Sequence, residues 1–280
     1  MAAVTAGADR AAPSTRRAPA GQRVSTSWTF LGLLERDWVV MKREWVAVLA
    51  RSAMQPLLFI VVFGWILQKL GTVNSDMGTF LIPGILAMST MLSGMQAVMM
   101  PIAIDLGFQR EIDDRILCPI RVDLIGVEKI LFGAGQGMLA ALFVLPLAAL
   151  IVPNADLSAG RLWALIPMLI ATSLMSASFG MFVGTLVPPR QLALVMSAVV
   201  TPLMFFGCTY YPWVALAQVS VVLKWLVVLN PLVYASEGMR AVLTPSVPHM
   251  PVWGIVVGTL ASVAVLGWIG IRRFTTRALE

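Results

Sequence analysis

Long runs without Asp, Glu, Lys or Arg are the strongest pattern in the chain. A membrane-spanning helix needs about 20 consecutive apolar residues, and a charge within it is costly. The charge-free runs predict six spans, which cover residues 53–70, 79–103, 130–152, 162–186, 191–211 and 252–271. We therefore expect an all-α integral membrane protein whose residues 47–280 form one six-helix transmembrane domain.

The segment 212–250 is also apolar, but prolines and short polar breaks interrupt it. We interpret it as an outer re-entrant region, with short helices that dip into the outer leaflet and return, joined at Asn230 and Pro231. Non-helical backbone at that depth finds no hydrogen-bond partners in lipid. Protein must therefore cover this segment.

The positively charged residues orient the spans, because Lys and Arg are concentrated in cytoplasmic loops. With both termini inside, sixteen of the 20 Lys and Arg residues lie on the inner side and four lie outside. The four outer residues are Lys69, Arg161, Lys224 and Arg240. The inverse topology would reverse this bias, so we predict that both termini are cytoplasmic.

Two segments precede the spans. Residues 1–26 are rich in Ala, Arg, Thr, Ser and Pro. They lack the apolar core of a secretory signal, so we expect a disordered cytoplasmic tail. Residues 27–46 carry apolar side chains at three- and four-residue spacing, which predicts an amphipathic helix in the membrane interface. The apolar stripe consists of Leu31, Leu34, Trp38, Met41 and Trp45. The alternative is a soluble helix packed on a partner protein.

Composition narrows the functional classes. Apolar residues make up 59% of the 280-residue chain and charged residues only 12%, whereas a soluble domain carries about 25% charged residues. This excludes a soluble enzyme, a nucleic-acid-binding domain and a disordered scaffold. The net charge of +6 is explained by the inner loops, so no nucleic-acid partner is expected.

The chain lacks the residues of a catalytic or ion-coupled site. It contains no Gly-x-x-x-x-Gly-Lys-[Ser/Thr] loop, so it does not by itself hydrolyse ATP in that way. The single histidine, His249, is better explained as a surface residue than as a metal ligand. No carboxylate lies in the middle of a predicted span, which argues against a membrane enzyme or an ion-coupled carrier. We predict no catalytic residue, metal or cofactor on this chain.

The predicted inner loop 105–129 contains an amphipathic segment. Ile112, Ile116 and Leu117 form an apolar edge beside a strongly charged face. Pro119 ends the segment, because proline disfavours a helical residue before it. A solvated loop needs no apolar edge, whereas a docking helix does. We therefore expect a partner protein to dock here.

This loop resembles the first inner loop of the ABC-2 type permeases, the membrane subunits of bacterial exporters. It carries Arg110-Glu111, Leu117, Pro119-Ile120-Arg121, Gly126 and Lys129, in the order typical of that family. Further matches are Thr201-Pro-Leu-Met-Phe-Phe-Gly207 followed by Tyr211-Pro212, and Asn230-Pro-Leu-Val-Tyr-Ala-Ser-Glu-Gly-Met-Arg240. The resemblance covers residues 27–275 and is nearest to the drug-resistance and nodulation-factor export branch. One departure is Ile112-Asp113-Asp114-Arg115, where the family often has Gly-Thr-Leu-Glu.

The resemblance implies an assembly of two permease chains and two ATP-binding subunits in the bacterial plasma (inner) membrane, surrounded by membrane lipids. ATP and Mg would be bound by the ATP-binding subunits, and the second permease would be an identical chain or a paralogue. The docking residues implied on this chain are Arg110, Glu111, Asp114, Arg115, Leu117, Pro119 and Arg121.

The function that we predict is ATP-driven export of an amphipathic drug, lipid or glycolipid, because apolar, charge-poor spans suit such a substrate. The alternatives are a permease for a polysaccharide or lipid-linked glycan and an ATP-independent membrane component. An outer gate is expected at Tyr211, Pro212, Asn230, Pro231, Glu237 and Arg240. A candidate substrate path consists of Met88, Met91, Met95, Met99, Ser93, Gln96 and Thr201.

Three of these assignments have a plainer alternative. The methionine stripe is more simply explained by ordinary helix packing than by a flexible ligand surface. Glu237 and Arg240 are equally compatible with a surface ion pair of about 0–1 kcal/mol. The Gly-x-x-x-Gly pairs at 133/137, 180/184 and 254/258 mark packing either within the chain or between two chains.

Overall fold

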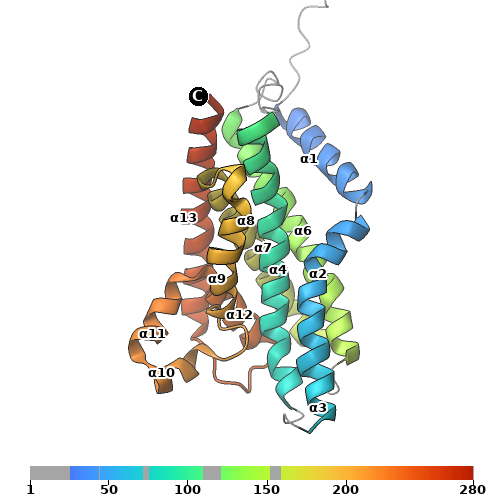
Figure 1. Cartoon of the computed structure of the whole chain (residues 1–280), viewed down its shortest axis with the longest axis vertical. Helices are drawn as coiled ribbons and strands as arrows, with labels where there is room; N and C mark the ends of the chain where they lie inside the picture. Colours follow the sequence, from blue (N-terminus) through green and yellow to red (C-terminus); the bar gives the residue numbers. More distant parts are fainter. Residues whose placement is uncertain (1–25, 44, 72–75, 110–120, 152–158, 280) are drawn as a thin grey trace, which may run out of the picture.

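The computed structural model describes residues 26–43, 45–71, 76–109, 121–151 and 159–279. All regular structure in these ranges is helical. Four long helices, α4 (Asp76–Ile104), α6 (Val122–Ile151), α7 (Ala159–Leu186) and α13 (Val252–Leu279), form the bundle seen in Figure 1. Each is long and apolar enough to cross a membrane, which confirms the second, third, fourth and sixth predicted spans.

The other two predicted spans are less complete. The first begins in α2 (Trp45–Val61), which contains Pro56, and continues through a π-helical turn, Val62–Ile66, into α3 (Leu67–Lys69). The fifth consists of α8 (Leu192–Val195), a π-helical turn at Met196–Val200, and α9 (Thr201–Phe205). Neither is a continuous helix that is long and apolar enough to cross a membrane. The described residues therefore contain four candidate spans, or five if the bent helix pair 221–243 forms one. The six-span topology stays a prediction.

The fifth predicted span, 191–211, is too long at its outer end. The helix stops at Phe205, and residues 206–211 form a turn. Cys208 has a φ of +53°, a backbone conformation that ends a right-handed helix and that few residues other than glycine adopt. This correction matters, because the turn brings Tyr210 back toward the bundle.

A sharp bend between two helices confirms the predicted break at Asn230 and Pro231. Helix α11 (Val221–Leu226) and its extension Val227–Leu229 meet α12 (Pro231–Leu243) at an angle of 101°. The Asn230 carboxamide oxygen accepts a hydrogen bond from the Leu232 amide at 3.0 Å, and Pro231 begins the helix. This is the arrangement expected of an N-cap followed by proline.

Helix α12 lies inside the bundle. Its buried residues include Pro231–Val233 and run without a break from 235 to 240. It packs against α4, α7 and α13, whereas α10 (Leu216–Val219) and α11 project from the bundle (Figure 1). Protein therefore covers the second half of the segment 212–250.

Small residues bring the central helices together within one chain. A Cβ atom at Gly180 of α7 would lie 2.4 Å from the Met95 carbonyl oxygen of α4, and one at Gly184 would lie 2.9 Å from the Met99 carbonyl oxygen. Helix α6 also approaches α4 closely, because a Cβ atom at Gly137 of α6 would lie 3.0 Å from the Thr90 carbonyl oxygen. Two of the Gly-x-x-x-Gly pairs thus serve packing within the chain.

The predicted amphipathic segment forms α1 (Thr26–Arg43), which extends outward at the same end of the bundle as the C-terminus (Figure 1). Leu31 is 56% exposed and Trp28 is 75% exposed, whereas Met41 is buried. Exposed apolar residues on this helix are compatible with contact to lipid. Its place in the membrane interface stays a prediction, and the predicted tail lies almost entirely outside the described residues.

Candidate functional site

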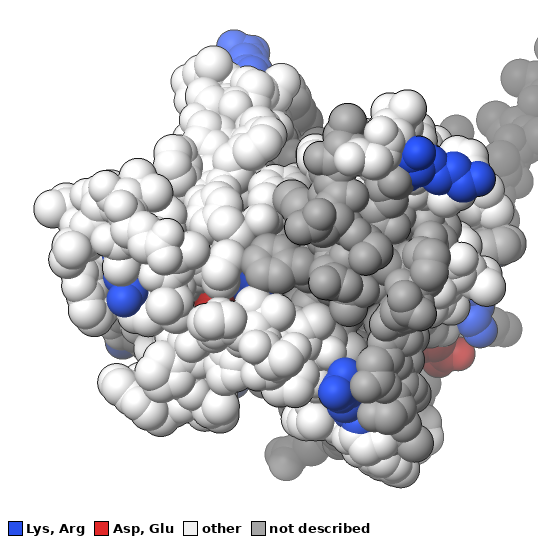
Figure 2. Space-filling model, turned by 90° about the horizontal axis from the view of Figure 1, so that it is seen from below, with Lys and Arg blue, Asp and Glu red and all other residues white. Residues whose placement is uncertain are grey.

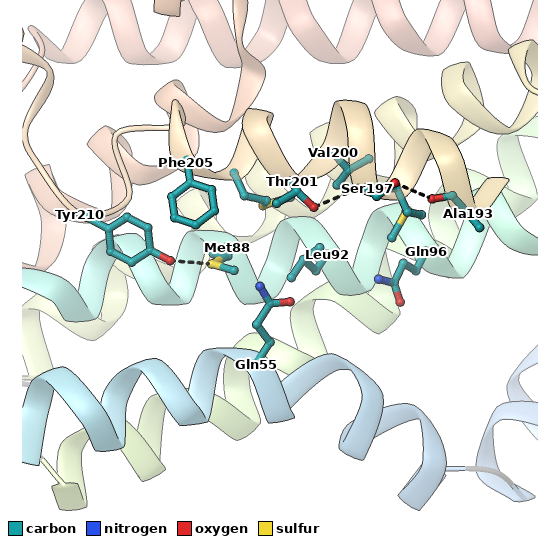
Figure 3. Close-up of a pocket in the computed structure, with 12 residues that line it drawn as sticks. Gln55, Met88, Leu92, Gln96, Ala193, Ser197, Val200, Thr201, Phe205 and Tyr210 are labelled. Carbon is teal, nitrogen blue, oxygen red and sulfur yellow. Dashed lines mark hydrogen bonds between the residues drawn. The ribbon is translucent and has the colours of Figure 1, made fainter. Parts of the chain in front are cut away.

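A groove of about 420 Å³ lies between α2, α4 and the helical segment α8–α9 (Figure 3). Helix α4 forms one wall, α2 contributes Gln55, and residues 193–205 form the facing wall. The lining residues are Gln55, Met88, Leu92, Gln96, Ala193, Met196, Ser197, Val200, Thr201, Met204, Phe205 and Tyr210.

The lining combines apolar bodies with neutral hydrogen-bonding groups. None of the twelve lining residues is charged. Thioethers, aliphatic groups and two aromatic rings provide the apolar surface, and two carboxamides and three hydroxyls provide polar atoms. Three thioethers give the wall an adaptable shape, because methionine is flexible and polarizable. The groove suits a ligand with an apolar body and uncharged polar groups.

Two of the hydroxyls are already engaged with the helix that carries them. The Ser197 hydroxyl donates to the Ala193 carbonyl oxygen at 3.1 Å, and the Thr201 hydroxyl donates to the Met196 carbonyl oxygen at the same distance. Their donors are therefore used, and their oxygen atoms are left as acceptors. The π-helical turn at Met196–Val200 lies in this wall, and such turns are frequent at functional sites.

Four aromatic side chains meet at one end of the groove. The Tyr210 ring centroid lies 5.2 Å from that of Phe59, 6.5 Å from that of Phe63 and 6.0 Å from that of Phe205. The Tyr210 hydroxyl donates to the Met88 sulfur at 3.7 Å (Figure 3). We call Phe59, Phe63, Phe205 and Tyr210 the aromatic cluster. It covers the end of the groove nearest the turn 206–212.

The predicted substrate-path residues separate into two groups. Met88, Gln96 and Thr201 line the groove. Met91, Met95 and Met99 are completely buried in the core of the bundle. Ser93 donates to the Gln136 carbonyl oxygen of α6 at 3.3 Å. The placement of this second group favours helix packing, the alternative that the sequence left open.

The predicted ion pair of Glu237 and Arg240 lies inside the protein, and both side chains are fully buried. Arg240 Nη1 donates to Glu237 Oε1, and Arg240 Nη2 donates to the Cys208 carbonyl oxygen at 3.0 Å. The same carboxylate accepts from the Trp213 amide at 2.9 Å and from the Met250 amide at 2.7 Å. The pair therefore connects α12 to three loop segments and is not a surface pair.

Two more predicted outer-gate residues hold the turn 206–212 and the bend. The Asn230 carboxamide nitrogen donates to the Leu203 carbonyl oxygen of α9 at 2.6 Å. The Tyr211 hydroxyl donates to the Phe205 carbonyl oxygen at 3.0 Å. Pro212 has an extended backbone conformation and precedes the short 3-10 helix Trp213–Ala215. These contacts keep the turn close to the end of α9.

The turn also lies directly on α4. A Cβ atom at Gly84 would lie 1.8 Å from the Thr209 carbonyl oxygen, so only glycine allows this approach. Cys208 and Thr209 are both completely buried, and Tyr210 follows them in the chain. The ion pair and the Gly84 contact together determine where the Tyr210 ring lies.

Most of the predicted docking residues cannot be placed, since Arg110, Glu111, Asp114, Arg115, Leu117 and Pro119 lie outside the described residues. Arg121 is described, and its exposed guanidinium lies 3.1 Å from the Asp123 carboxylate. Asp123 also accepts a hydrogen bond from Thr275 of α13 at 2.7 Å. The start of α6 is thus connected to α13.

Sequence reasoning missed Gln55, Phe59, Phe63 and Tyr210. Phe59 and Phe63 stand four residues apart in the first predicted span and so share one helix face. That spacing indicates an aromatic helix face at this position. No sequence feature indicates the role of Tyr210, because the fifth predicted span, 191–211, continues through it. Among the described residues, no three His, Cys, Asp or Glu side chains form a group that could hold a metal ion.

Comparison with known proteins gives a consistent match. Residues 29–244 match the family model described as ABC-2 type transporter. The chain is 23% identical over 237 residues to the inner membrane transport permease YadH of Escherichia coli K12, which covers 82% of this chain and 90% of the relative. YadH of Shigella flexneri matches to the same extent. No solved structure matches the chain significantly.

Proposed function

The chain belongs to the ABC-2 type transporter family and is a permease subunit of such a transporter without an ATPase site of its own; we propose that it exports an uncharged amphipathic drug, lipid or glycolipid through the groove between α2, α4 and α8–α9. It lies in the inner membrane and partners an ATP-binding subunit. The complete transporter contains two permease chains and two copies of that subunit, which carry ATP and Mg, and one copy docks at the loop 105–129 of this chain.

The observation that carries this proposal is the neutral lining of the groove. A charge moved into such a wall would lose its hydration without gaining a counter-ion, so charged substrates are disfavoured. An amphipathic molecule finds apolar surface beside Met88, Met196 and Met204, and hydrogen-bond partners at Gln55 and Gln96. This supports an uncharged amphipathic substrate over a highly charged one, and it does not separate a lipid from an uncharged glycan.

The aromatic cluster is the outer gate of this path. With both termini inside, it lies at the outer end of the groove. The described residues on the face at that end are mostly uncharged, with a few scattered basic and acidic side chains (Figure 2). The buried Glu237–Arg240 pair supports the gate by holding Cys208, and with it the turn that carries Tyr210, in one position. Release of substrate requires this turn or α2 to move.

A second permease chain covers the open side of the groove. The helices on either side of it carry exposed apolar residues, including Leu58 (57% exposed), Trp65 (49%), Leu194 (63%) and Phe205 (53%). In the native assembly these residues contact the other permease or lipid. A homodimer and a pair of paralogues both satisfy this arrangement.

The test begins with co-purification from the native host. Mild extraction is expected to recover an ATP-binding subunit, and alteration of residues 108–121 is expected to remove it. Cells that express both subunits are then loaded with an uncharged fluorescent amphipathic dye or with its permanently cationic analogue. We expect ATP-dependent efflux of the uncharged dye only.

The variant Gln96→Leu removes a carboxamide from the groove and should slow this efflux. The matched control is Gln218→Leu, because Gln218 is an exposed residue of α10 outside the groove. Equal efflux by the two variants, or efflux of the cationic dye alone, would overturn the proposal.

A further inference from the structure

We propose that the ion pair between Asp37 and Lys129 is a positioning contact that makes α1 and α6 move together, so that a displacement of α6 beside the docking loop reaches α2 and the groove. The inference rests on the proposed function, because it concerns how ATP-driven movement reaches the substrate path. Lys129 lies near the N-terminal end of α6, which begins at Val122, shortly after the predicted docking segment 110–120.

The ion pair joins two helices that are far apart in the sequence. Lys129 Nζ donates to Asp37 Oδ2, although the residues are 92 positions apart. Both side chains are largely withdrawn from solvent, with 7% of Lys129 and 13% of Asp37 exposed. A buried charge is stable only when an opposite charge neutralises it. Each of these residues therefore depends on the other.

Two further charges complete the group. Glu128 Oε2 lies 3.7 Å from Lys129 Nζ, and the Glu128 side chain is only 1% exposed. Arg36 Nε lies 3.6 Å from Asp37 Oδ1 on the more exposed side of α1. Among the described residues, two acidic and two basic groups thus alternate across the contact.

Apolar contacts flank the ion pair. Leu33 of α1 packs beside a core cluster that includes Ile125 and Ile130 of α6. A Cβ atom at Gly135 of α6 would lie 3.9 Å from the Trp38 ring, an ordinary contact distance, so the tryptophan packs close to the α6 backbone. Helix α1 therefore contacts the first half of α6 at several positions along the helix, and the Asp37–Lys129 ion pair lies among these contacts.

Helix α1 leads directly to the groove wall. Only residue 44 separates α1 from α2, and α2 contributes Gln55 to the groove and Phe59 to the aromatic cluster. Coupling between distant sites is carried by rigid elements and by the ion pairs that join them. One route therefore runs from the docking loop through α6, the Asp37–Lys129 pair and α1 to α2, in addition to the direct packing of α2 against α6.

The test compares Asp37→Asn with Glu35→Gln in the reconstituted complex of permease and ATP-binding subunit. Both substitutions replace one carboxylate of α1 by its amide, but Glu35 is exposed and Asp37 is not. The measured quantities are transport per ATP hydrolysed and hydrogen exchange of the α1 and α2 amides, per folded complex. Lys129→Gln removes the other charge and replaces Asp37→Asn if that variant gives no folded protein.

We expect Asp37→Asn to lower transport per ATP at least about fivefold, the lower end of typical coupling between sites. Amide exchange in α1 should accelerate, and Asp37→Glu should restore most of the coupling, whereas Glu35→Gln should match the wild type. An unchanged transport ratio in Asp37→Asn, or an equal loss in Glu35→Gln, would overturn the inference. If the wild-type complex shows no ATP-driven transport, the proposed function fails. Hydrogen exchange alone then decides the inference, and unchanged exchange in α1 refutes it.

Discussion

At the scale of single residues, the buried ion pair in α12 is the contact on which most of the outer region depends. Glu237 accepts from Arg240 and from two backbone amides, so its carboxylate is fully engaged. Removing one partner of a buried ion pair leaves an uncompensated charge, which costs about 3–5 kcal/mol.

We therefore expect Glu237→Ala to lower the free energy of unfolding by about that amount and to lower the thermal transition measured in detergent. The exposed residue Glu35 provides the control, and Glu35→Ala should change stability by less than about 0.5 kcal/mol. Similar stabilities of the two variants would show that the pair is not structurally important.

Tyr210 is the residue that closes the groove in this account. Replacing it with alanine removes three ring contacts, each worth about 0.5–1.5 kcal/mol. In a Met88→Cys variant, Tyr210→Ala should let a membrane-impermeant maleimide modify residue 88 from outside about tenfold faster. Tyr210→Phe keeps the ring and should leave the rate nearly unchanged. Protein without Met88→Cys provides the background, and equal rates in all variants would contradict the gate.

At the scale of elements, the contact between α4 and the turn 206–212 depends on a glycine. A Cβ atom at Gly84 would meet the Thr209 backbone, which cannot rotate away as a side chain can. We expect Gly84→Ala to destabilise the protein by about 1–3 kcal/mol, as overpacking does. Gly32→Ala on α1 is the control, since a Cβ atom there meets nothing within 4 Å. A thermal transition lowered equally by both variants would contradict this reading.

The sequence predicted elements best where one rule dominates. Four charge-free runs correspond to α4, α6, α7 and α13, because hydropathy alone identifies a long apolar helix. Asn230 and Pro231 predicted the bend, because N-capping and proline geometry are local effects. The predicted end of the fifth span was wrong, because residues 206–211 carry no charge and the turn that they form depends on contacts with α4 and α12.

Contacts between elements were not visible in the sequence. Asp37 and Lys129 each look like an ordinary charge of an inner segment, and only the fold brings them together. The methionine stripe of α4 is regular in sequence and all four side chains are buried, but only Met88 also lines the groove. Met95 and Met99 lie against Gly180 and Gly184 of α7. Periodicity predicts which residues share a face, and it does not predict what lies against that face.

At the scale of the whole molecule, the positions of the docking loop and the outer gate depend on the orientation of the bundle. Both termini are predicted inside, and the turn 206–212 is predicted outside. An epitope inserted at Ser246, an exposed residue between α12 and α13, should be reached by antibody in intact cells. An epitope at the C-terminus should be reached only after permeabilisation. The opposite pattern would invert the assignment of inner loop and outer gate.

The central claim is that an uncharged amphipathic substrate occupies the groove between α2, α4 and α8–α9. Photolabelling tests it most directly, with an uncharged amphipathic diazirine probe and mass spectrometry of the complex in lipid nanodiscs. We predict label on Gln55, Gln96 and the segment 196–205, and loss of that label with excess unlabelled probe. Label spread over exposed apolar residues of α13 such as Trp253 and Val257, without competition, would contradict the claim.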